Sequence, residues 1–372
     1  MIDPVKELGL AAPIFAFSHC RDVVVEVTKA GGFGVLGAVS FSPEQLEQEL
    51  RWIDEHVEGR AYGVDMLIPG TYDKEAEEST TPLLDLIPKK YMEFSDRVLD
   101  EAGIPRLPDD IQEELRKRLT ARDKNVTPAG ARRLIEVALR HPQIRLFVGA
   151  LGPMPKELVE EFHRRDIIVG GQCGKGKHAL RHLDVGTDFL IAQGSEAGGH
   201  TGEISTMVLV PDVVKHAAGK MSVLAAGGIS HGSQILAAQA MGAVGVWTGT
   251  IWLGTAESEL TPFEKEALFA ADAEDAVRRK VLSGKTVRMI RSKYTEAWEG
   301  PESPGYLPAP LQGLVFLQAR ARIDRAQNKE FYSSPAGQVI GGMTEETTVR
   351  EVMYRLQNEY ADAVDRVSGI IG

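Results

Sequence analysis

The sequence is poor in cysteine and has no long apolar run. Its 372 residues include two cysteines, Cys20 and Cys173, too few for a disulfide framework or a four-cysteine zinc site. No apolar stretch approaches the roughly 20 residues that cross a bilayer. The N-terminus also lacks the basic region and apolar core of a secretory signal. We therefore expect a cytoplasmic protein with two buried, inert thiols and no membrane partner.

Positive charge is also scarce. The chain has 42 lysines and arginines against 53 acidic residues, a formal net charge of -11. Such a charge disfavours general binding to nucleic acids and to acidic membranes. The hydrophobic share of 43% and the charged share of 26% are typical of a soluble globular protein. The length suits one large α/β domain or two ordinary ones.

Short apolar runs alternate with segments of helical periodicity, a pattern typical of a parallel sheet built from strand-helix units. Eight such runs close a (β/α)8 TIM barrel, an α/β fold with its sites at the carboxyl ends of the strands. The predicted strands are Pro13–Phe17, Phe33–Leu36, Ala61–Met66, Arg145–Gly149, Ile167–Gly170, Phe189–Ala192, Ser222–Ala226 and Val244–Trp247.

The spacing of these strands predicts two additions to the barrel. About 70 residues, 70–142, separate the third and fourth strands, too many for one crossover, so we expect a helical insertion there. Past residue 255 the sequence becomes mainly helical and charged. We therefore assign the barrel to residues 1–255 and a helical C-terminal extension, packed on the barrel, to 256–372. This long extension also offers a surface for a homodimer.

Residues 223–250 have the pattern of a phosphate site. One predicted strand ends in Gly227-Gly228, a small-residue helix covers Ser233–Met241, and the next strand ends in Thr248-Gly249-Thr250. The last two strand ends of a TIM barrel often hold a phosphate between backbone N–H groups and a helix N-terminus. We expect the two threonines to add hydroxyl donors. The alternative is a pair of tight turns whose glycines only supply positive φ.

A second glycine-rich loop, AQGSEAGGHTGE, spans residues 192–203. It holds four glycines around His200 and follows the sixth predicted strand. Glycines at this density allow a backbone to approach a ligand closely, and a histidine at the barrel mouth suits acid-base chemistry. The alternative for His200 is a loop histidine bonded to backbone. For Glu196 we expect a structural role, paired with backbone or a basic side chain.

Together these segments resemble the nitronate monooxygenase family. AQGSEAGGHTG, LAAGGI and the TGT strand end carry the resemblance, with further matches at AGGFGVLG (30–37) and GKTVRMIR (284–291). It covers most of residues 5–295, with the insertion outside it. The resemblance implies an FMN-bound TIM barrel in which His200 is a general base, and implies no metal. The implied FMN contacts are Phe17, Ser18, Asp65, Gln193, Gly198, Gly199, Gly227, Gly228, Trp247, Thr248, Gly249 and Thr250.

The chain also departs from the family pattern. The first strand is followed by Ser18-His19-Cys20, where many members have Gln-Ala-Pro-Met, so the pocket there differs. His19 is either a second catalytic histidine or a pocket-lining residue. Asp65 replaces an asparagine and either lies near the flavin or caps a helix. Lys177, in the run GGQCGKGKH, either reaches the FMN phosphate or is solvated.

The resemblance implies that the substrate is a small molecule, an alkyl nitronate oxidised with O2 to a carbonyl compound and nitrite. A rival reading keeps the flavin but uses NAD(P)H to reduce a quinone or an enoyl thioester. Two further classes are a flavin-free barrel acting on sugar phosphates and a non-catalytic barrel that only holds FMN. A yellow protein with absorbance typical of flavins excludes the flavin-free class.

Overall fold

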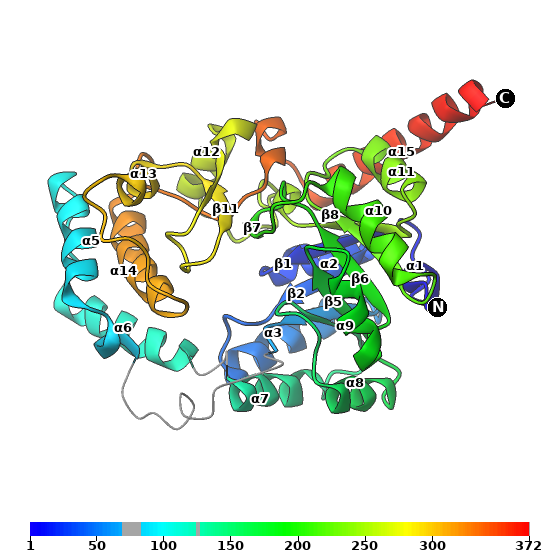
Figure 1. Ribbon diagram of the computed structural model, residues 1–372, viewed down its shortest axis with the longest axis horizontal. Helices are drawn as coiled ribbons and strands as arrows, with labels where there is room; N and C mark the ends of the chain where they lie inside the picture. Colours follow the sequence, from blue (N-terminus) through cyan, green and yellow to red (C-terminus); the bar gives the residue numbers. More distant parts are fainter. Residues whose placement is uncertain (69–82, 124–126, 372) are drawn as a thin grey trace.

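Eight parallel strands form a closed barrel in the computed structural model, which describes residues 1–68, 83–123 and 127–371 (Figure 1). All eight predicted strands are present, with small shifts at their ends, and the (β/α)8 prediction is confirmed. In barrel order the strands are β1 (Ile14–Ser18), β2 (Phe33–Gly37), β3 (Tyr62–Met66), β4 (Ile144–Gly149), β5 (Ile168–Cys173), β6 (Phe189–Gln193), β8 (Ser222–Ala226) and β9 (Gly245–Thr248).

Bulky side chains fill the barrel interior. Phe15 packs against Phe33, Phe189 and Trp247, with ring centroids 5.5 to 6.3 Å apart. These residues alternate along their strands with side chains that face the surrounding helices, as strand geometry requires. The helices on the barrel side are α1 (Pro4–Glu7), α2 (Arg21–Lys29), α3 (Pro43–His56), α7 (Pro128–Ala138), α8 (Lys156–His163), α9 (His178–Val185), α10 (Thr206–Ala217) and α11 (Gly232–Ala240).

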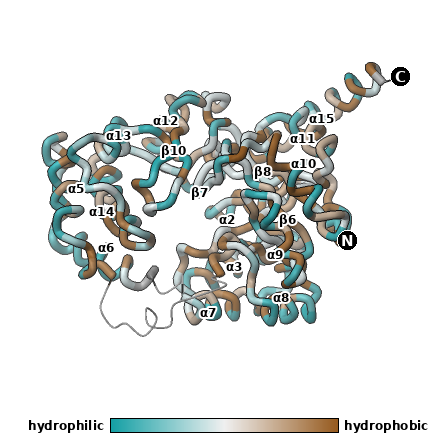
Figure 2. Tube along the Cα trace, in the orientation of Figure 1, coloured by the Kyte–Doolittle hydropathy of each residue, from teal (hydrophilic) through white to brown (hydrophobic). Residues whose placement is uncertain are grey.

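The insertion and most of the extension form a second lobe with its own apolar core, and hydrophobic stretches occur in both lobes (Figure 2). Phe94 of the insertion packs edge-to-face on Trp298 of the extension, with centroids 5.0 Å apart. The lobe contains η1 (Leu83–Leu86), α5 (Lys89–Glu101), α6 (Asp109–Asp123), α12 (Pro262–Phe269), η4 (Ala273–Asp275), α13 (Lys293–Glu299), α14 (Leu311–Ala326) and η5 (Gln338–Gly342).

A buried arginine fastens the two parts of this lobe together. Arg322 on α14 donates to the carboxylates of Asp96 (2.8 Å) and Asp100 (2.6 Å) on α5. The guanidinium is almost completely buried, so removing both carboxylates would leave a costly unpaired charge. The insertion helices α5 and α6 thus belong to this lobe, whereas α7, which also lies within the predicted insertion, packs on the barrel. Residues 69–82 and 124–126 lie outside the described chain.

We expected the whole extension to pack on the barrel, and the structure divides it instead. Only the last helix, α15 (Val349–Ile371), lies along the barrel helices α2 and α11. The Glu359 carboxylate on α15 accepts a hydrogen bond from the N–H of Gly232, the first residue of α11 (2.8 Å). The rest of the extension has its apolar side chains in the second core, because that is where the insertion supplies a matching surface.

A small antiparallel sheet, absent from the sequence-based prediction, connects the lobes (Figure 1). It consists of β10 (Ala276–Arg279), β11 (Val287–Ile290) and the two-residue β7 (Gly199–His200). In its register His200 pairs with Val287. The glycine-rich histidine loop of the barrel is therefore hydrogen-bonded to the second lobe.

None of the described helices has the length and apolarity needed to cross a membrane.

Candidate functional site

Two adjacent strand ends present free backbone donors. Ala226 of β8 pairs with Trp247 of β9, so the chain leaves both strands side by side. The N–H groups that follow have no acceptor among the described residues. They belong to Gly227, Gly228, Ile229, Gly249, Thr250 and Ile251. Six convergent donors without partners, which we call the N–H cradle, fit a bound anion such as a phosphate.

Backbone conformation explains the glycine pair in the cradle. Gly227 and Gly228 have φ of 100° and 72°, in the left-handed region that favours glycine. A Cβ at Gly228 would also lie 3.1 Å from the Cβ of Glu196. Glycine is therefore needed for both the turn and the open approach to the donors.

The helix expected to point at the phosphate is already capped by protein groups. The Gln234 side chain accepts from the N–H groups of Ser230 (2.8 Å) and His231 (3.0 Å), and Glu359 accepts from Gly232. The N-terminus of α11, one residue earlier than predicted, is thus occupied. The free helix terminus belongs instead to the 3-10 helix η3 (Thr250–Trp252), which directly follows β9.

The two threonines differ in what they can donate. The Thr248 hydroxyl donates to the Phe15 carbonyl and accepts from the Trp252 indole, so our expectation that it faces the phosphate is wrong. It lies on the outward side of β9, because residues alternate along a strand. The Thr250 hydroxyl accepts from the Gly337 N–H at 2.8 Å and keeps its own proton to donate.

Aromatic rings lie toward the carboxyl ends of β1 and β9, and β9 leads into the cradle. The Trp247 side chain is buried in the barrel, stacked 6.3 Å from Phe17. Phe17 is half-buried and meets the ring of His19 edge-on at 5.1 Å. His19 Nδ1 lies 2.9 Å from the Gly37 carbonyl, and both roles considered for this residue stay predictions.

Ser18, the last residue of β1, and Cys20, just after it, are hydrogen-bonded to each other. The Ser18 hydroxyl accepts from the Cys20 N–H at 3.0 Å, a contact that turns the chain into α2. The thiols of Cys20 and Cys173 are both buried, as predicted for inert cysteines. Burial raises the pKa of Cys173 to about 12. Neither thiol is available as a nucleophile at neutral pH.

A buried carboxyl group lies at the top of the barrel. Asp65 on β3 accepts a hydrogen bond from the Gln172 amide on β5 at 3.1 Å. Asp65 is 5% exposed, and this burial raises its pKa to about 8. The hydrogen bond from Gln172 lowers the pKa, but by less than burial raises it. Asp65 therefore caps no helix, and near neutral pH it is largely protonated. Gln172 was missed because nothing in the sequence links β3 to β5.

The histidine loop is fixed by Glu196 and an adjacent helix. The Glu196 carboxylate accepts from the N–H of Thr206 at 3.0 Å and from its hydroxyl at 3.0 Å. A carboxylate at the N-terminus of α10 is also favoured by the helix dipole. Gly194 is required at this contact, because a Cβ would lie 2.1 Å from the Thr206 hydroxyl oxygen. The structural role predicted for Glu196 is confirmed.

His200 is exposed and bonded to the second lobe. Its Nε2 atom lies 2.7 Å from the Ser283 hydroxyl oxygen. The protein atoms packed around part of the ring, together with the charge of Lys285, lower the pKa of His200. The imidazole is thus neutral at pH 7, the form that a general base requires. Nδ1 is the ring nitrogen without a partner among the described residues.

Two segments of the second lobe donate hydrogen bonds to the histidine loop. The Arg288 guanidinium on β11, buried with its residue 8% exposed, donates to the Ser195 carbonyl at 2.7 Å. The Gln338 N–H donates to the Glu196 carbonyl at 3.0 Å. The segment GKTVRMIR, which contains Arg288, already resembled the family in the sequence. That Arg288 donates to the Ser195 carbonyl could not be predicted from the sequence.

The glycines next to His200 play different parts. A Cβ at Gly198 would lie 2.8 Å from the backbone of Ala336 and Gly337, so this glycine lets the second lobe approach. Gly199 has φ of 81° and open space where a Cβ would be. Flavin contact by these two residues stays a prediction. Gln193, by contrast, lines a cavity at the end of β6.

The N–H donors of the cradle fit the phosphate group of a nucleotide cofactor. The described residues contain no cluster of His, Cys, Asp and Glu suited to a metal ion. The whole arrangement lies at the carboxyl ends of the strands, where TIM barrels carry their sites.

Comparisons with known proteins agree with this arrangement. A family profile described as nitronate monooxygenase matches residues 10–359. A Mycobacterium tuberculosis protein whose name assigns it to the monooxygenases is 43% identical over 372 residues, which cover 98% of this chain and 97% of that protein. A Staphylococcus haemolyticus protein whose name assigns it to the nitronate monooxygenases is 27% identical, over 90% of this chain and 88% of its own.

Solved structures share the fold. Nitroalkane oxidase from Streptomyces ansochromogenes superimposes with a TM-score of 0.79 at 22% identity, over 98% of this chain and all of that one. FabK from Thermotoga maritima gives 0.73 at 21% identity, with full coverage of both chains. The family match also spans the insertion, which we had placed outside the resemblance. The chain thus belongs to the nitronate monooxygenase family and is an oxidoreductase.

Proposed function

We propose that the protein is an FMN-dependent nitronate monooxygenase that oxidises alkyl nitronates with O2 to a carbonyl compound and nitrite. The observation that supports this most is the N–H cradle, whose six free donors follow β8 and β9. A flavin whose phosphate occupied the cradle would extend from it over the mouth of the barrel. When bound, FMN supplies the electron acceptor of the reaction.

The chain's own residues would hold the cofactor and handle the proton. The Thr250 hydroxyl keeps a proton to donate to the phosphate, and the Phe17 ring lies where a flat ring system needs an apolar neighbour. Asp65, in its protonated form, is a hydrogen-bond donor at the barrel top. Its neutrality avoids placing a negative charge beside a reduced flavin.

His200 would be the general base. With its Nε2 atom protonated and bonded to Ser283, Nδ1 is free to accept the α-proton of a nitroalkane and so to form the nitronate within the site. A histidine of lowered pKa is unprotonated throughout the neutral range, as this step requires. The β7–β11 pairing would keep the ring in one orientation relative to the substrate.

A second candidate keeps the flavin and takes electrons from NAD(P)H, passing them to a quinone or an enoyl thioester. Two observations favour it: the unusual first loop with His19, and a basic cavity beside the barrel mouth, described below. The first loop and the basic cavity both lie in the proposed substrate region, and neither is part of the N–H cradle.

Anaerobic mixing separates the two candidates. The purified protein is expected to be yellow and to lose its flavin absorbance when an alkyl nitronate is added, and to form nitrite when O2 is admitted. Loss of absorbance with NADH or NADPH, and none with the nitronate, would show that the second candidate is correct. A colourless protein that takes up no added FMN would contradict both.

A further inference from the structure

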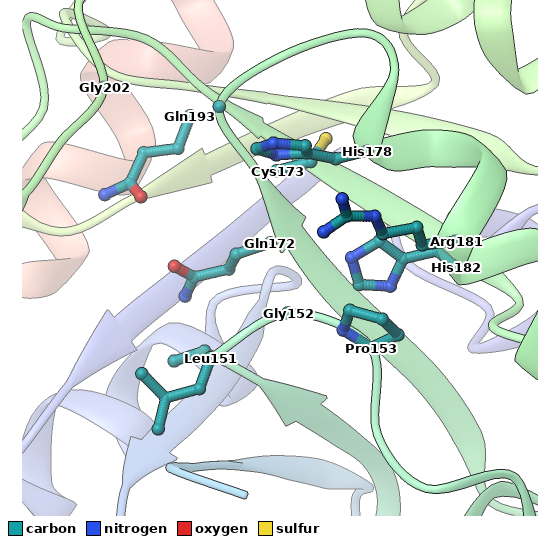
Figure 3. Close-up of a pocket in the computed structure, with 12 residues that line it drawn as sticks. Leu151, Gly152, Pro153, Gln172, Cys173, His178, Arg181, His182, Gln193 and Gly202 are labelled. Atoms are coloured by element: carbon teal, nitrogen blue, oxygen red, sulfur yellow. The ribbon is translucent and has the colours of Figure 1, made fainter. Parts of the chain in front are cut away.

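We infer that a basic cavity over β4, β5 and β6 is a second anion site, which binds the phosphoryl group of a co-substrate. It deepens the proposed function, because it specifies the chemistry of the molecule that exchanges electrons with the flavin. The cavity has a volume of about 360 Å³ and opens at the carboxyl ends of these strands. Its lining runs from Gln193 and Gln172 to α9 (Figure 3).

This cavity is separate from the N–H cradle. The cradle follows β8 and β9, whereas the basic side chains follow β5, and β6 stands between the two groups in the barrel. Figure 3 shows the amides of Gln172 and Gln193 on one side and Arg181 with His182 on the other. A molecule bound here would thus reach from the barrel mouth, beside Asp65, to the basic side chains on α9.

Charges around the cavity are of one sign, in a chain whose net charge is -11. Its lining holds Arg181 and His178 and no carboxylate, and the exposed Lys175 and Lys177 come just before His178 in the sequence. Neither lysine nor Arg181 forms an ion pair with a described carboxylate. Burial and the charges of Arg181 and the two lysines lower the pKa of His178. These three cations therefore share one positive field, in which His178 itself is neutral at pH 7. Such a field without counter-ions favours a divalent anion.

Two acidic groups near the cavity are engaged elsewhere. Asp212 accepts from the N–H of Gly176 at 3.1 Å and lies 3.2 Å from His216. Asp65 accepts from the Gln172 amide. Neither lines the cavity, so neither neutralises its basic side.

A buried histidine supplies a further, independent sign of a ligand. His182 is 1% exposed and lines the cavity, and its Nε2 atom has no hydrogen-bond partner among the described residues. Nδ1 lies 3.3 Å from the Thr187 hydroxyl. When that hydroxyl donates to Nδ1, Nε2 carries the proton and is a donor toward the cavity. An unpaired buried donor is costly unless a ligand accepts from it.

Isothermal titration calorimetry with pyrophosphate as the probe tests this site. FMN-loaded protein is used, because the cofactor then occupies the cradle. We expect pyrophosphate to bind with a millimolar or tighter Kd and Arg181→Gln to weaken binding by about tenfold, the effect of losing one hydrogen bond to a charged group. Arg325→Gln, which removes an exposed arginine on α14, is the matched control and should leave the Kd unchanged.

His182→Phe provides a second variant that keeps the ring volume and removes the buried donor. It should also weaken binding, with thermal melting as the check that the fold is retained. The proposal is wrong if the wild type does not bind pyrophosphate, or if Arg181→Gln and Arg325→Gln both bind like the wild type.

Titrations with NADPH and with coenzyme A distinguish a nicotinamide nucleotide from a pantetheine thioester as the source of the phosphoryl group. The true source should bind the wild type and lose affinity in Arg181→Gln. Failure of the proposed function remains distinguishable: if the protein takes up no FMN, pyrophosphate is titrated into the flavin-free chain. Dependence on Arg181 then still reports the α9 site, because Arg181 is not part of the cradle.

Discussion

The Nε2 atom of His200 lies 2.7 Å from the hydroxyl oxygen of Ser283, a residue of the second lobe. The histidine belongs to a barrel loop, so its ring is oriented by a part of the chain 83 positions away. The backbone of His200 is held in the same way, by pairing with Val287. The second lobe thus determines how the proposed base faces its substrate, in addition to enclosing the site.

Replacing His200 by glutamine tests its role as the base. Glutamine keeps a hydrogen-bonding group near Ser283 but cannot accept a proton at neutral pH, so kcat/KM for a neutral nitroalkane should fall about 10²- to 10⁴-fold. A preformed alkyl nitronate, which has no α-proton to lose, should be affected much less. FMN affinity, measured by flavin fluorescence, should stay within about twofold, because His200 lies outside the cradle. An unchanged kcat/KM would remove His200 from the chemistry.

The pH dependence of kcat/KM should show an acid limb below the usual histidine pKa of about 6.5. Packing and Lys285 lower the pKa of His200, so the neutral, active form persists to lower pH and is lost only as the pH falls through that lowered value. Lys285→Gln removes one of these causes and should move the limb to higher pH. A limb that stays in place in Lys285→Gln would assign it to another group.

Arg288→Gln should loosen the histidine loop without unfolding the protein. The guanidinium donates to the carbonyl oxygens of Ser195 and Ala276, and glutamine is too short to reach both. We expect kcat to fall about tenfold, since misplacement of a catalytic group is costly, and amide hydrogen exchange of residues 194–203 to become faster. Arg291→Gln, three residues along, is exposed and serves as the control. Equal exchange rates in both variants would mean that Arg288 does not position the loop.

The barrel could be predicted from the sequence because each strand is a local signal. Runs such as Phe189–Ala192 are apolar, short and followed by glycine, and their number alone specifies closure. The turn at Gly227-Gly228 could be predicted because its signal is also local. The positive φ at Gly228 restricts the residue type at that one position.

The second lobe and the finer site geometry could not be predicted, because they depend on contacts between distant residues. The Arg322–Asp96 pair joins positions more than 200 residues apart. The two-residue strand at His200 has no periodicity to detect. Thr248 was misassigned because its hydroxyl is bonded to the Phe15 carbonyl on the neighbouring strand β1, a pairing that the sequence does not show. Such partners become visible only in the folded chain.

Gly228→Ala should weaken FMN binding. The added methyl group meets Glu196 at the edge of the cradle, and the left-handed φ adds strain of about 1–2 kcal/mol. Gly219→Ala is a matched control, because Gly219 has φ of 69° and nothing near its Cβ position. Both variants should lose similar melting temperature, whereas only Gly228→Ala should raise the Kd for FMN, measured by fluorescence quenching. Equal Kd values would mean that the cradle does not hold the phosphate.

Asp65 gives a prediction about stability that follows from its burial. Its pKa is about 8 in the folded protein, above its value of about 4 in an unfolded chain, so folding favours the protonated form. The stability that this preference contributes is fully present below about pH 4 and is lost as the pH rises toward about 8. The ionised carboxylate thus destabilises the fold under alkaline conditions.

Asp65→Asn should therefore stabilise the protein increasingly as the pH rises. Asparagine keeps an oxygen for the Gln172 amide and cannot ionise, so its free energy of unfolding should exceed that of the wild type by up to about 5 kcal/mol near pH 9, with the difference shrinking toward pH 5. Urea unfolding across this range measures it. Asp184→Asn, at an exposed position on α9, should give no such trend. A wild type and an Asp65→Asn variant with parallel pH profiles would mean that Asp65 is ionised in the folded protein and solvated or paired there.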